Sequence, residues 1–439
     1  MKKNKQNNNI LGNTKANSEL KSRILFVLLC LIVYRIGTYI PIAGIDATIL
    51  KSIFEKQSSG VLGVFNMLSG GSLGRMTIFA LAIMPYISAS IIIQLLTVAI
   101  PYLSHLKKEG ESGRKKISQY TRYFTVLLSI VQAYGISVGL ENMSIDGRYA
   151  VVESGYFFRL STTITLTAGT LFLMWLGEQM SARGVGNGIS LIIFSGIVAE
   201  MPAGFVSLSN LNIGSVAVFL ILFFAVILML LIVFVEKAQR KILIQYPKRQ
   251  IGNKLYNGEK THLPLKINTA GVIPPIFAST ILLFPLTIAN FNSESAPDWL
   301  MFLTSHLGHG QPMYVLLYVA IIMFFSFFYT SIVFNSEETS DNLKKNGGFV
   351  AGIRPGKQTA DYFDQVLTKL TVIGGIYLAF ICAAPEFLVA KYSIPFFLGG
   401  TSLLIIVNVI MDFITQIQSH LFANKYENLI KKSQLKGNR

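Results

Sequence analysis

Apolar residues along this chain come in long uninterrupted runs separated by polar stretches, instead of recurring at the spacing of one helix face. A helix needs about 20 predominantly apolar residues to cross the hydrocarbon layer of a membrane, so runs of this kind predict membrane-spanning helices. The pattern predicts ten spans, at Ile24–Ile40, Met76–Ile100, Tyr123–Leu140, Leu160–Glu178, Ile189–Val206, Ile213–Val235, Thr269–Asn290, Met313–Phe334, Val366–Ala384 and Ile394–Met411. We therefore expect an all-α polytopic membrane protein.

A shorter apolar segment, Val61–Leu68, comes shortly before the second span and is too short to cross. Gly70, Gly71 and Gly74 follow it and supply a flexible reversal. We expect this segment to enter the membrane as a re-entrant half-helix. Because lipid offers backbone N–H and C=O groups no hydrogen-bond partner, such a segment must be buried in protein or line a watery cavity. The segment therefore predicts a cavity inside the bundle.

The composition supports a membrane protein, since 52% of the 439 residues are apolar and only 14% are charged. Most of the 38 Lys and Arg residues lie in the two tails and in the connections on the same side as the tails. Basic residues accumulate on the cytoplasmic side of membrane proteins. We therefore expect both termini in the cytoplasm, with a polar N-terminal tail over residues 1–22 that begins disordered and a C-terminal tail over residues 413–439.

The connections over residues 236–268 and 335–369 are longer and more basic than membrane orientation requires. We expect both to project from the membrane and to bind anionic lipid, ribosomal RNA or an acidic face of a soluble partner, all of which clustered Lys and Arg favour. The alternative is that the net charge of +16 reflects topology alone. The sequence leaves both interpretations open.

Motifs for catalysis are weak in this chain. Residues 70–74 match the G-x-S-x-G pattern of a serine nucleophile, which needs a base within hydrogen-bond reach, but all five His residues lie outside the predicted spans. Residues 351–358 resemble a phosphate-binding loop, with Ala351 in place of its first Gly and Gln358 in place of the Ser or Thr that holds magnesium. Neither Cys has a neighbouring ligand for a metal. We expect no enzymatic activity, no cofactor and no metal.

An ion-coupled secondary transporter is the main alternative class, because such proteins build their binding sites from interrupted helices. Pro274, Pro275 and Pro285 disturb the seventh span in this way. Coupling to protons or sodium usually places carboxylates near the membrane centre, however. The carboxylates of the spans lie toward span ends, at Glu178, Glu200, Glu386 and Asp412. An interior of Ile, Ser, Thr, Gln and Asn favours a hydrophobic constriction over an ion site.

Several long motifs in order closely resemble the SecY family of bacterial protein-translocation channel subunits. The likeness extends from about Leu20 to the C-terminal tail. The motifs that carry it are FNMLSGGSLGRMTIFALAIMPYISASIIIQLLT, KKEGESGRKKISQYTRY, FLMWLGEQMSARGVGNGIS, THLPLKINTAGVIP, NSEETSDNLKK, GIRPGKQTADY and FLGGTSLLI.

This resemblance implies two pseudo-symmetric halves, residues 23–206 and 207–412, arranged as a clamshell around an hourglass pore. It implies a plug near residues 61–73 that closes the outer funnel, with the residues Val61, Val64, Phe65, Asn66, Met67, Leu68, Ser69, Gly70 and Gly71. The family's pore ring corresponds to Ile83, Ile87, Ile189, Ile193, Ile276 and Ile405. A ring of branched apolar side chains offers ions no solvation and can part around a polypeptide of any sequence.

The resemblance also implies a lateral gate between spans two and three on one side and seven and eight on the other. Polar positions of the gate correspond to Ser88, Gln94 and Asn268. On the cytosolic face, Arg354 in GIRPG corresponds to an arginine that couples the channel to the motor ATPase SecA and to the ribosome. In the other loop, the family often has two adjacent arginines where this chain has Asn253 and Lys254. We expect Lys248, Arg249 and Lys254 to be the basic residues of this loop that contact the motor or the ribosome.

The function implied is a central protein-conducting channel of the Sec translocon in the cytoplasmic (inner) membrane. Such a channel moves unfolded secretory polypeptides across the membrane and releases membrane-protein segments laterally into it. SecA or a translating ribosome supplies the energy. SecE-like and SecG-like small membrane subunits brace the clamshell, and the remaining partners are nascent chains and anionic lipids.

Overall fold

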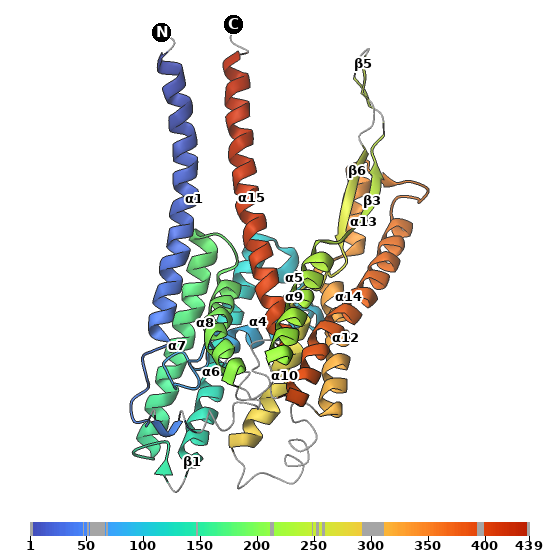
Figure 1. Cartoon of the computed structure of the whole chain (residues 1–439). Helices are drawn as coiled ribbons and strands as arrows, with labels where there is room; N and C mark the ends of the chain where they lie inside the picture. The colour runs from blue at the N-terminus through green and yellow to red at the C-terminus, as the bar shows by residue number, and fades with distance from the viewer. Residues whose placement is uncertain are drawn as a thin grey trace.

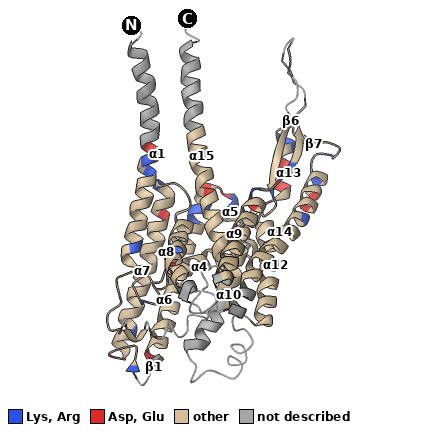
Figure 2. Cartoon of the chain, in the orientation of Figure 1, with Lys and Arg blue, Asp and Glu red and all other residues tan. Residues whose placement is uncertain are grey.

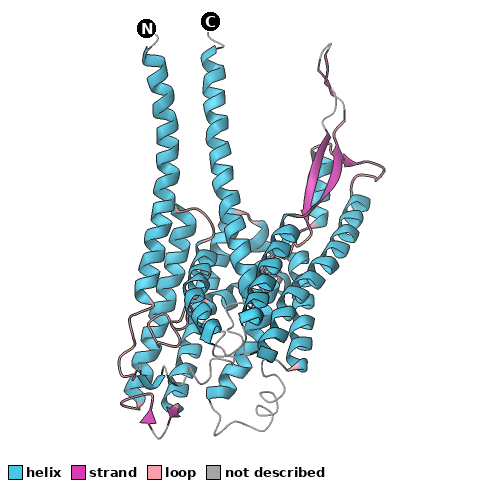
Figure 3. Cartoon of the chain, in the orientation of Figure 1, coloured by secondary structure: helices cyan, strands magenta, loops and turns pink. Residues whose placement is uncertain are grey.

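The computed structural model of the chain is mostly helical (Figure 1, Figure 3). It describes residues 3–46, 48–50, 52, 66, 69–145, 148–210, 215–247, 249–251, 254–256, 260–291, 311–392 and 399–436. The helices of the first half are α1 (Lys3–Gly37), α4 (Met84–Ala99), α5 (Pro101–Lys108), α6 (Glu111–Asn142), α7 (Tyr156–Arg183) and α8 (Gly188–Asn210). Those of the second half are α9 (Ser215–Lys237), α10 (Ile273–Phe291), α12 (Pro312–Val333), α13 (Ser336–Lys345), α14 (Lys357–Tyr392) and α15 (Gly400–Lys436).

A helix covers most or all of each predicted span. In the described ranges, seven helices are long and apolar enough to cross a membrane, and α4 with α5, bent by 99° at their junction, adds an eighth. The first predicted span lies in α1 and the seventh in α10. Charged residues lie mainly toward the ends of the bundle, and its middle is apolar or uncharged (Figure 2). The polytopic helical fold is thereby confirmed.

The second span begins at Met84 and not at Met76, so this boundary of the prediction was wrong. The residues before Met84 form turns, with φ angles of +44° at Met76 and +47° at Ala82, which an α-helix cannot contain. Their backbone groups are bonded elsewhere, since the Ile78 N–H donates to the Ile40 carbonyl at 3.0 Å. Hydropathy detects the apolar side chains here but not these long-range backbone partners.

Both tails continue their spans as helices. The disordered start predicted for the N-terminal tail is wrong from Lys3 onward, because α1 begins there, and α15 extends to Lys436. Neither tail contains a proline that would end the helix. The two termini lie at the same end of the bundle (Figure 1).

Short strands form in the connections. A small hairpin pairs β1 (Ser144–Ile145) with β2 (Arg148–Tyr149) at the end of the bundle away from the termini (Figure 1). At the end that carries the termini, β3 (Gln239–Gln245) pairs antiparallel with β6 (Lys260–Lys266) over their whole length. β4 (Arg249–Ile251) and β5 (Lys254–Tyr256) form the tip of this projecting hairpin.

The two long connections form one body. The strand β7 (Phe349–Val350) comes from the second connection and adds to β3 of the first, with Ile244 opposite Val350. An apolar core lies between this sheet and α14, in which Ile242 and Leu265 are buried and Phe363 is fully inaccessible. Burial of these side chains fixes the second connection against the first.

Three buried clusters hold the bundle. One lies within the first half and includes Leu140 and Leu166, and another lies within the second half and includes Ile322 and Ile381. The third lies between the halves, where α15 packs against α1 and α8. The helices therefore divide into two packed halves, which meet at this third cluster and also where α10 contacts α4 and α6.

Candidate functional site: an apolar constriction between the halves

The six isoleucines of the predicted pore ring come together between the two halves. They lie at the start of α4, on α8, on α10 and on α15, and all six belong to one hydrophobic cluster. A small hollow lies between them. Its lining consists of Ala82, Ile83, Met84, Ile87, Ile193, Ile276, Ser279, Thr401 and Ile405. Residues separated by more than 300 positions in the chain therefore border one space.

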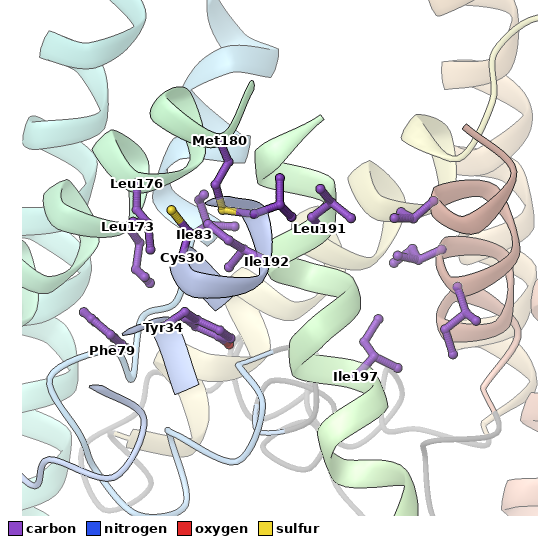
Figure 4. Packing of buried hydrophobic residues seen from close by; sticks show 14 residues of the cluster. Cys30, Tyr34, Phe79, Ile83, Leu173, Leu176, Met180, Leu191, Ile192 and Ile197 are labelled. Atoms are coloured by element: carbon purple, nitrogen blue, oxygen red, sulfur yellow. The ribbon is translucent and has the colours of Figure 1, made fainter. Parts of the chain in front are cut away.

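Five of the six isoleucines line this hollow, and Ile189 does not. The side chain of Ile189 packs against Gly177 of α7 instead. The contact is so close that a Cβ atom added at Gly177 would lie 3.1 Å from the Ile189 Cγ1 atom. Ile83 and Ile405 are only 1% and 3% exposed. Ile83 lies among side chains of α1, α7 and α8, close to Cys30 and Ile192 (Figure 4).

The few polar groups of the hollow are already hydrogen-bonded. The Ser279 hydroxyl donates to the Ile276 carbonyl at 2.9 Å, and the Thr401 hydroxyl shares a hydrogen bond of 2.8 Å with Tyr318. None of the residues that line the hollow carries a charge. An ion that entered would exchange its hydration shell for apolar side chains and two hydroxyl groups, so we expect the space to be a barrier to ions.

The predicted plug is described only at its C-terminal end. Val61, Val64, Phe65, Met67 and Leu68 lie outside the described residues. The other predicted plug residues, Asn66, Ser69, Gly70 and Gly71, lie at or next to a turn that leads towards the second span.

Positive φ angles at Gly70 (+66°) and Gly71 (+79°) make this turn. Asn66 closes it, accepting from the Gly71 N–H with its backbone carbonyl at 2.8 Å and from the Gly74 N–H with its side-chain oxygen at 2.6 Å. Glycine is suited to both left-handed positions.

An arginine within the first span holds this turn. The guanidinium of Arg35 donates to the Gly70 carbonyl at 2.9 Å and to the Tyr39 hydroxyl at 3.2 Å. Arg75 lies over the ring of Tyr39, 4.5 Å from its centroid, and pairs with Glu200 of α8 at 3.5 Å. Sequence reasoning did not connect Arg35 to the turn, although a charge inside an apolar run was the available signal.

The seam between α4 and the helices α10 and α12 is apolar. Ile87 and Ile91 of α4 pack with Phe277 of α10 and Phe325 of α12 in one cluster. The rings of Phe277 and Phe325 stack with centroids 4.8 Å apart. Separating α4 from α10 and α12 would therefore mainly expose apolar side chains, which a lipid or an apolar peptide segment can cover.

Two of the three predicted polar gate residues, Gln94 and Asn268, bond on their own sides of this seam. Asn268 is buried, and its side-chain amide donates to Glu236 at 2.6 Å and to the Gly271 carbonyl at 3.1 Å. Gln94 donates to Ser90, one turn away on α4, at 3.5 Å. The hydroxyl of Ser88 is buried without a hydrogen-bond partner among the described residues. Within the described ranges, no hydrogen bond joins Ser88, Gln94 and Asn268.

The predicted contact residue Arg354 is exposed on a loop between β7 and α14. Gly352 (φ +82°) and Gly356 (φ +104°) turn the backbone on either side of it. Lys248 lies outside the described residues, whereas Arg249 and Lys254 lie in the paired strands β4 and β5. The loop and the hairpin belong to the same projecting body.

Two packed helical halves that meet at an uncharged apolar constriction define a multi-pass membrane channel. The chain belongs to the SecY family, since a family model with that description matches residues 77–414. The protein translocase subunit SecY of Rickettsia felis is 59% identical over 426 residues, covering 96% of this chain and 98% of that protein. The protein of the same name from Escherichia coli K12 is 53% identical over 425 residues, covering 95% and 96%.

Solved structures share the fold. One is a structure described for the SecY plug domain, which stabilises the closed state of that channel and maintains a membrane seal. Its TM-score is 0.66 at 17% identity, and the match covers 92% of this chain and 93% of the other chain. Sec61 in a canine ribosome-channel complex from the endoplasmic reticulum has a TM-score of 0.63 at 17% identity, with the same coverage. Both similarities cover 92% of this chain and therefore include both of its halves.

Proposed function

We infer that this chain is the protein-conducting channel subunit of a translocon. The observation that carries this inference is the constriction, where apolar side chains from four helices meet between two separately packed halves. A moving polypeptide presents every kind of side chain in turn. Apolar contacts are non-directional, so they can separate around any of these side chains and close again behind them.

The proposed route across the membrane passes through the hollow lined by Ile83, Ile193 and Ile405, with the segment near residues 61–73 as the plug on the outer side. The proposed lateral exit is the seam between α4 and α10. A hydrophobic segment that enters this seam would replace the contacts of Ile91 and Phe277 with apolar contacts of its own.

The projecting body formed by the two long connections is the proposed docking surface for the energy source. Arg354 contacts a motor ATPase or a ribosome, and Lys248, Arg249 and Lys254 add basic contacts to ribosomal phosphates. SecE-like and SecG-like subunits brace the exposed apolar faces, and anionic lipids bind near the basic ends of the helices. The protein lies in the cytoplasmic (inner) membrane with both termini in the cytosol and performs no catalysis itself.

Crosslinking of a secretory chain stalled in transit tests the proposed route. Single photo-crosslinking probes replace Ile83, Ile193 and Ile405 at the constriction. Leu230, 65% exposed on α9, is the lipid-facing control, and Ile322, fully buried within the second half, is the control for burial alone. Crosslinks at all three constriction positions and at neither control are the expected result.

The absence of crosslinks at the constriction, in stalled complexes that remain stable, would overturn the polypeptide route. The small-solute transporter would then become the better interpretation. Crosslinks at Ile322 as strong as those at Ile83 would show that burial alone determines the reaction, and would also contradict the assigned path.

A further inference from the structure

The segment NSEETSDNLKK forms α13, whose residues have no role in the function proposed so far. The side chain of Asn335 caps this helix by accepting from the Glu338 N–H at 3.2 Å. Ser336 and Ser340 are buried, and their spacing of four residues puts both on one face. Buried hydroxyls need partners, and here the partners lie outside α13.

Ser336 binds the start of α14, since its hydroxyl donates to a carboxylate oxygen of Asp364. Ser340 reaches the loop that carries Arg354, and its hydroxyl donates to the Gly356 carbonyl at 2.7 Å. A second hydroxyl reaches this loop from α14, because Thr359 donates to the Arg354 carbonyl at 2.9 Å. Ser340 and Thr359 are each only 2% exposed.

The two hydroxyls hold the carbonyls on either side of Pro355. Proline has no N–H group and fixes its own φ angle. The backbone of the tip is therefore held by Ser340 and Thr359 and by the proline ring, while the side chain of Arg354 remains exposed. Directional bonds to a backbone fix the direction in which the side chain leaves it, which reduces the conformational freedom that binding would remove.

We propose that Ser340 and Thr359 are positioning residues for Arg354, presenting its guanidinium in one direction to the motor ATPase. This proposal rests on the proposed contact role of Arg354. The loss of either hydroxyl leaves Arg354 in place but lets the tip take other conformations. Binding of the motor therefore weakens, whereas the channel itself is unchanged.

The test measures the affinity of the motor ATPase for the complete channel complex in membrane vesicles. The variants are Ser340→Ala and Thr359→Val, with Thr359→Ser as the conservative variant that keeps the hydroxyl. Thr339→Ala is the matched control, because the Thr339 hydroxyl donates at 2.8 Å to the Asn335 carbonyl at the start of its own helix. We expect affinity to fall about three- to tenfold in Ser340→Ala and Thr359→Val, and to remain unchanged in the control and in Thr359→Ser.

A double-mutant cycle with Arg354→Ala separates positioning from a general structural role. If the hydroxyls act through Arg354, Ser340→Ala has no further effect on affinity in the Arg354→Ala background. Equal losses in both backgrounds, or a Ser340→Ala variant that behaves as Thr339→Ala does, would overturn the positioning role while the contact role of Arg354 stands. Normal affinity in Arg354→Ala would overturn the contact role and the positioning role together.

Discussion

At the constriction, Ile83 and Ile405 are held by apolar contact, and the hydroxyls around the hollow bond to their own surroundings. In the loop of Arg354, by contrast, the fixed contacts are hydrogen bonds to the carbonyls of Arg354 and Gly356. The constriction joins helices that are distant in sequence, whereas the loop lies between α13 and α14, which are neighbours in the chain. The two regions also differ in the kind of force that joins their elements.

This difference corresponds to two mechanical requirements. Dispersion and hydrophobic contacts depend little on direction, so an apolar constriction can open to different widths and close again. Hydrogen bonds depend strongly on distance and angle, so they fix one geometry. A pore that must admit many sequences suits the first kind, and a contact that must recognise one partner suits the second.

The largest expected effect is at the loop that carries Arg354. Arg354→Glu reverses the charge at the exposed tip of the loop. A carboxylate there would repel the group on the partner that binds the guanidinium. We expect transport driven by the motor ATPase to fall by about tenfold or more, with normal amounts of protein in the membrane. Resting ion conductance serves as the internal control and should not change. Unimpaired transport in this variant would remove Arg354 from the mechanism.

The second effect is at the constriction. Replacing Ile83 and Ile193 together by glycine removes two branched side chains from the lining of the hollow. Water and ions can then occupy the space, and we expect the resting conductance in planar bilayers to rise about tenfold. Leu230→Gly is the matched control, since it makes the same kind of substitution on the lipid-facing side of α9. A resting conductance equal to that of the control would contradict the barrier.

Sequence patterns predicted the spans well because each depends on local hydropathy. The constriction was harder to predict from the sequence, since isoleucine is abundant in every span and only the family resemblance selected Ile83, Ile276 and Ile405. Their convergence depends on how two halves pack, which no local pattern encodes. Ile189 shows what local spacing cannot predict. It lies four residues before Ile193, which predicts a shared helix face, but its side chain packs beside Gly177 of α7 and does not line the hollow.

Long-range backbone contacts explain the other differences. The pairing of β7 with β3 joins connections about 100 residues apart, and only the fold brings them together. The late start of α4 has the same origin, because the Ile40 carbonyl binds a residue that hydropathy assigns to the second span. The contact of the Ser340 hydroxyl with the Gly356 carbonyl also follows from tertiary structure, whereas the contact of Thr359 with the Arg354 carbonyl is local.

A third effect, on stability instead of transport or conductance, compares packing beside the hollow with packing away from it. Ile405 borders the hollow, whereas Ile381 is fully buried in the second half. Since Ile405 already lacks contact atoms on one side, Ile405→Ala should cost about 2 kcal/mol of unfolding free energy and Ile381→Ala about 4 kcal/mol. Unfolding by denaturant in detergent micelles measures both. Equal losses would indicate that Ile405 is packed as tightly as the interior of a half.

The smallest expected effect is at the loop backbone. Gly356 has a φ angle of +104°, and a Cβ atom added there would meet nothing within 4 Å. Gly356→Ala therefore adds no steric contact and only makes a positive φ angle less favourable. If the loop keeps its geometry, the free energy of its conformation rises by about 1–2 kcal/mol. The loop can avoid this cost by turning differently, which would displace the Gly356 carbonyl from Ser340.

The expected result for Gly356→Ala is a two- to fivefold loss of motor-driven transport (about 0.4–1 kcal/mol), without a change in resting conductance. Gly135→Ala is the control, because Gly135 lies in α6 and its added Cβ atom also meets nothing within 4 Å. Alanine favours a helix, so this control should be neutral or slightly stabilising. Equal transport in Gly356→Ala and Gly135→Ala would show that motor-driven transport tolerates other backbone geometries of the loop. The hydrogen bonds from Ser340 and Thr359 would then not be needed to fix the tip.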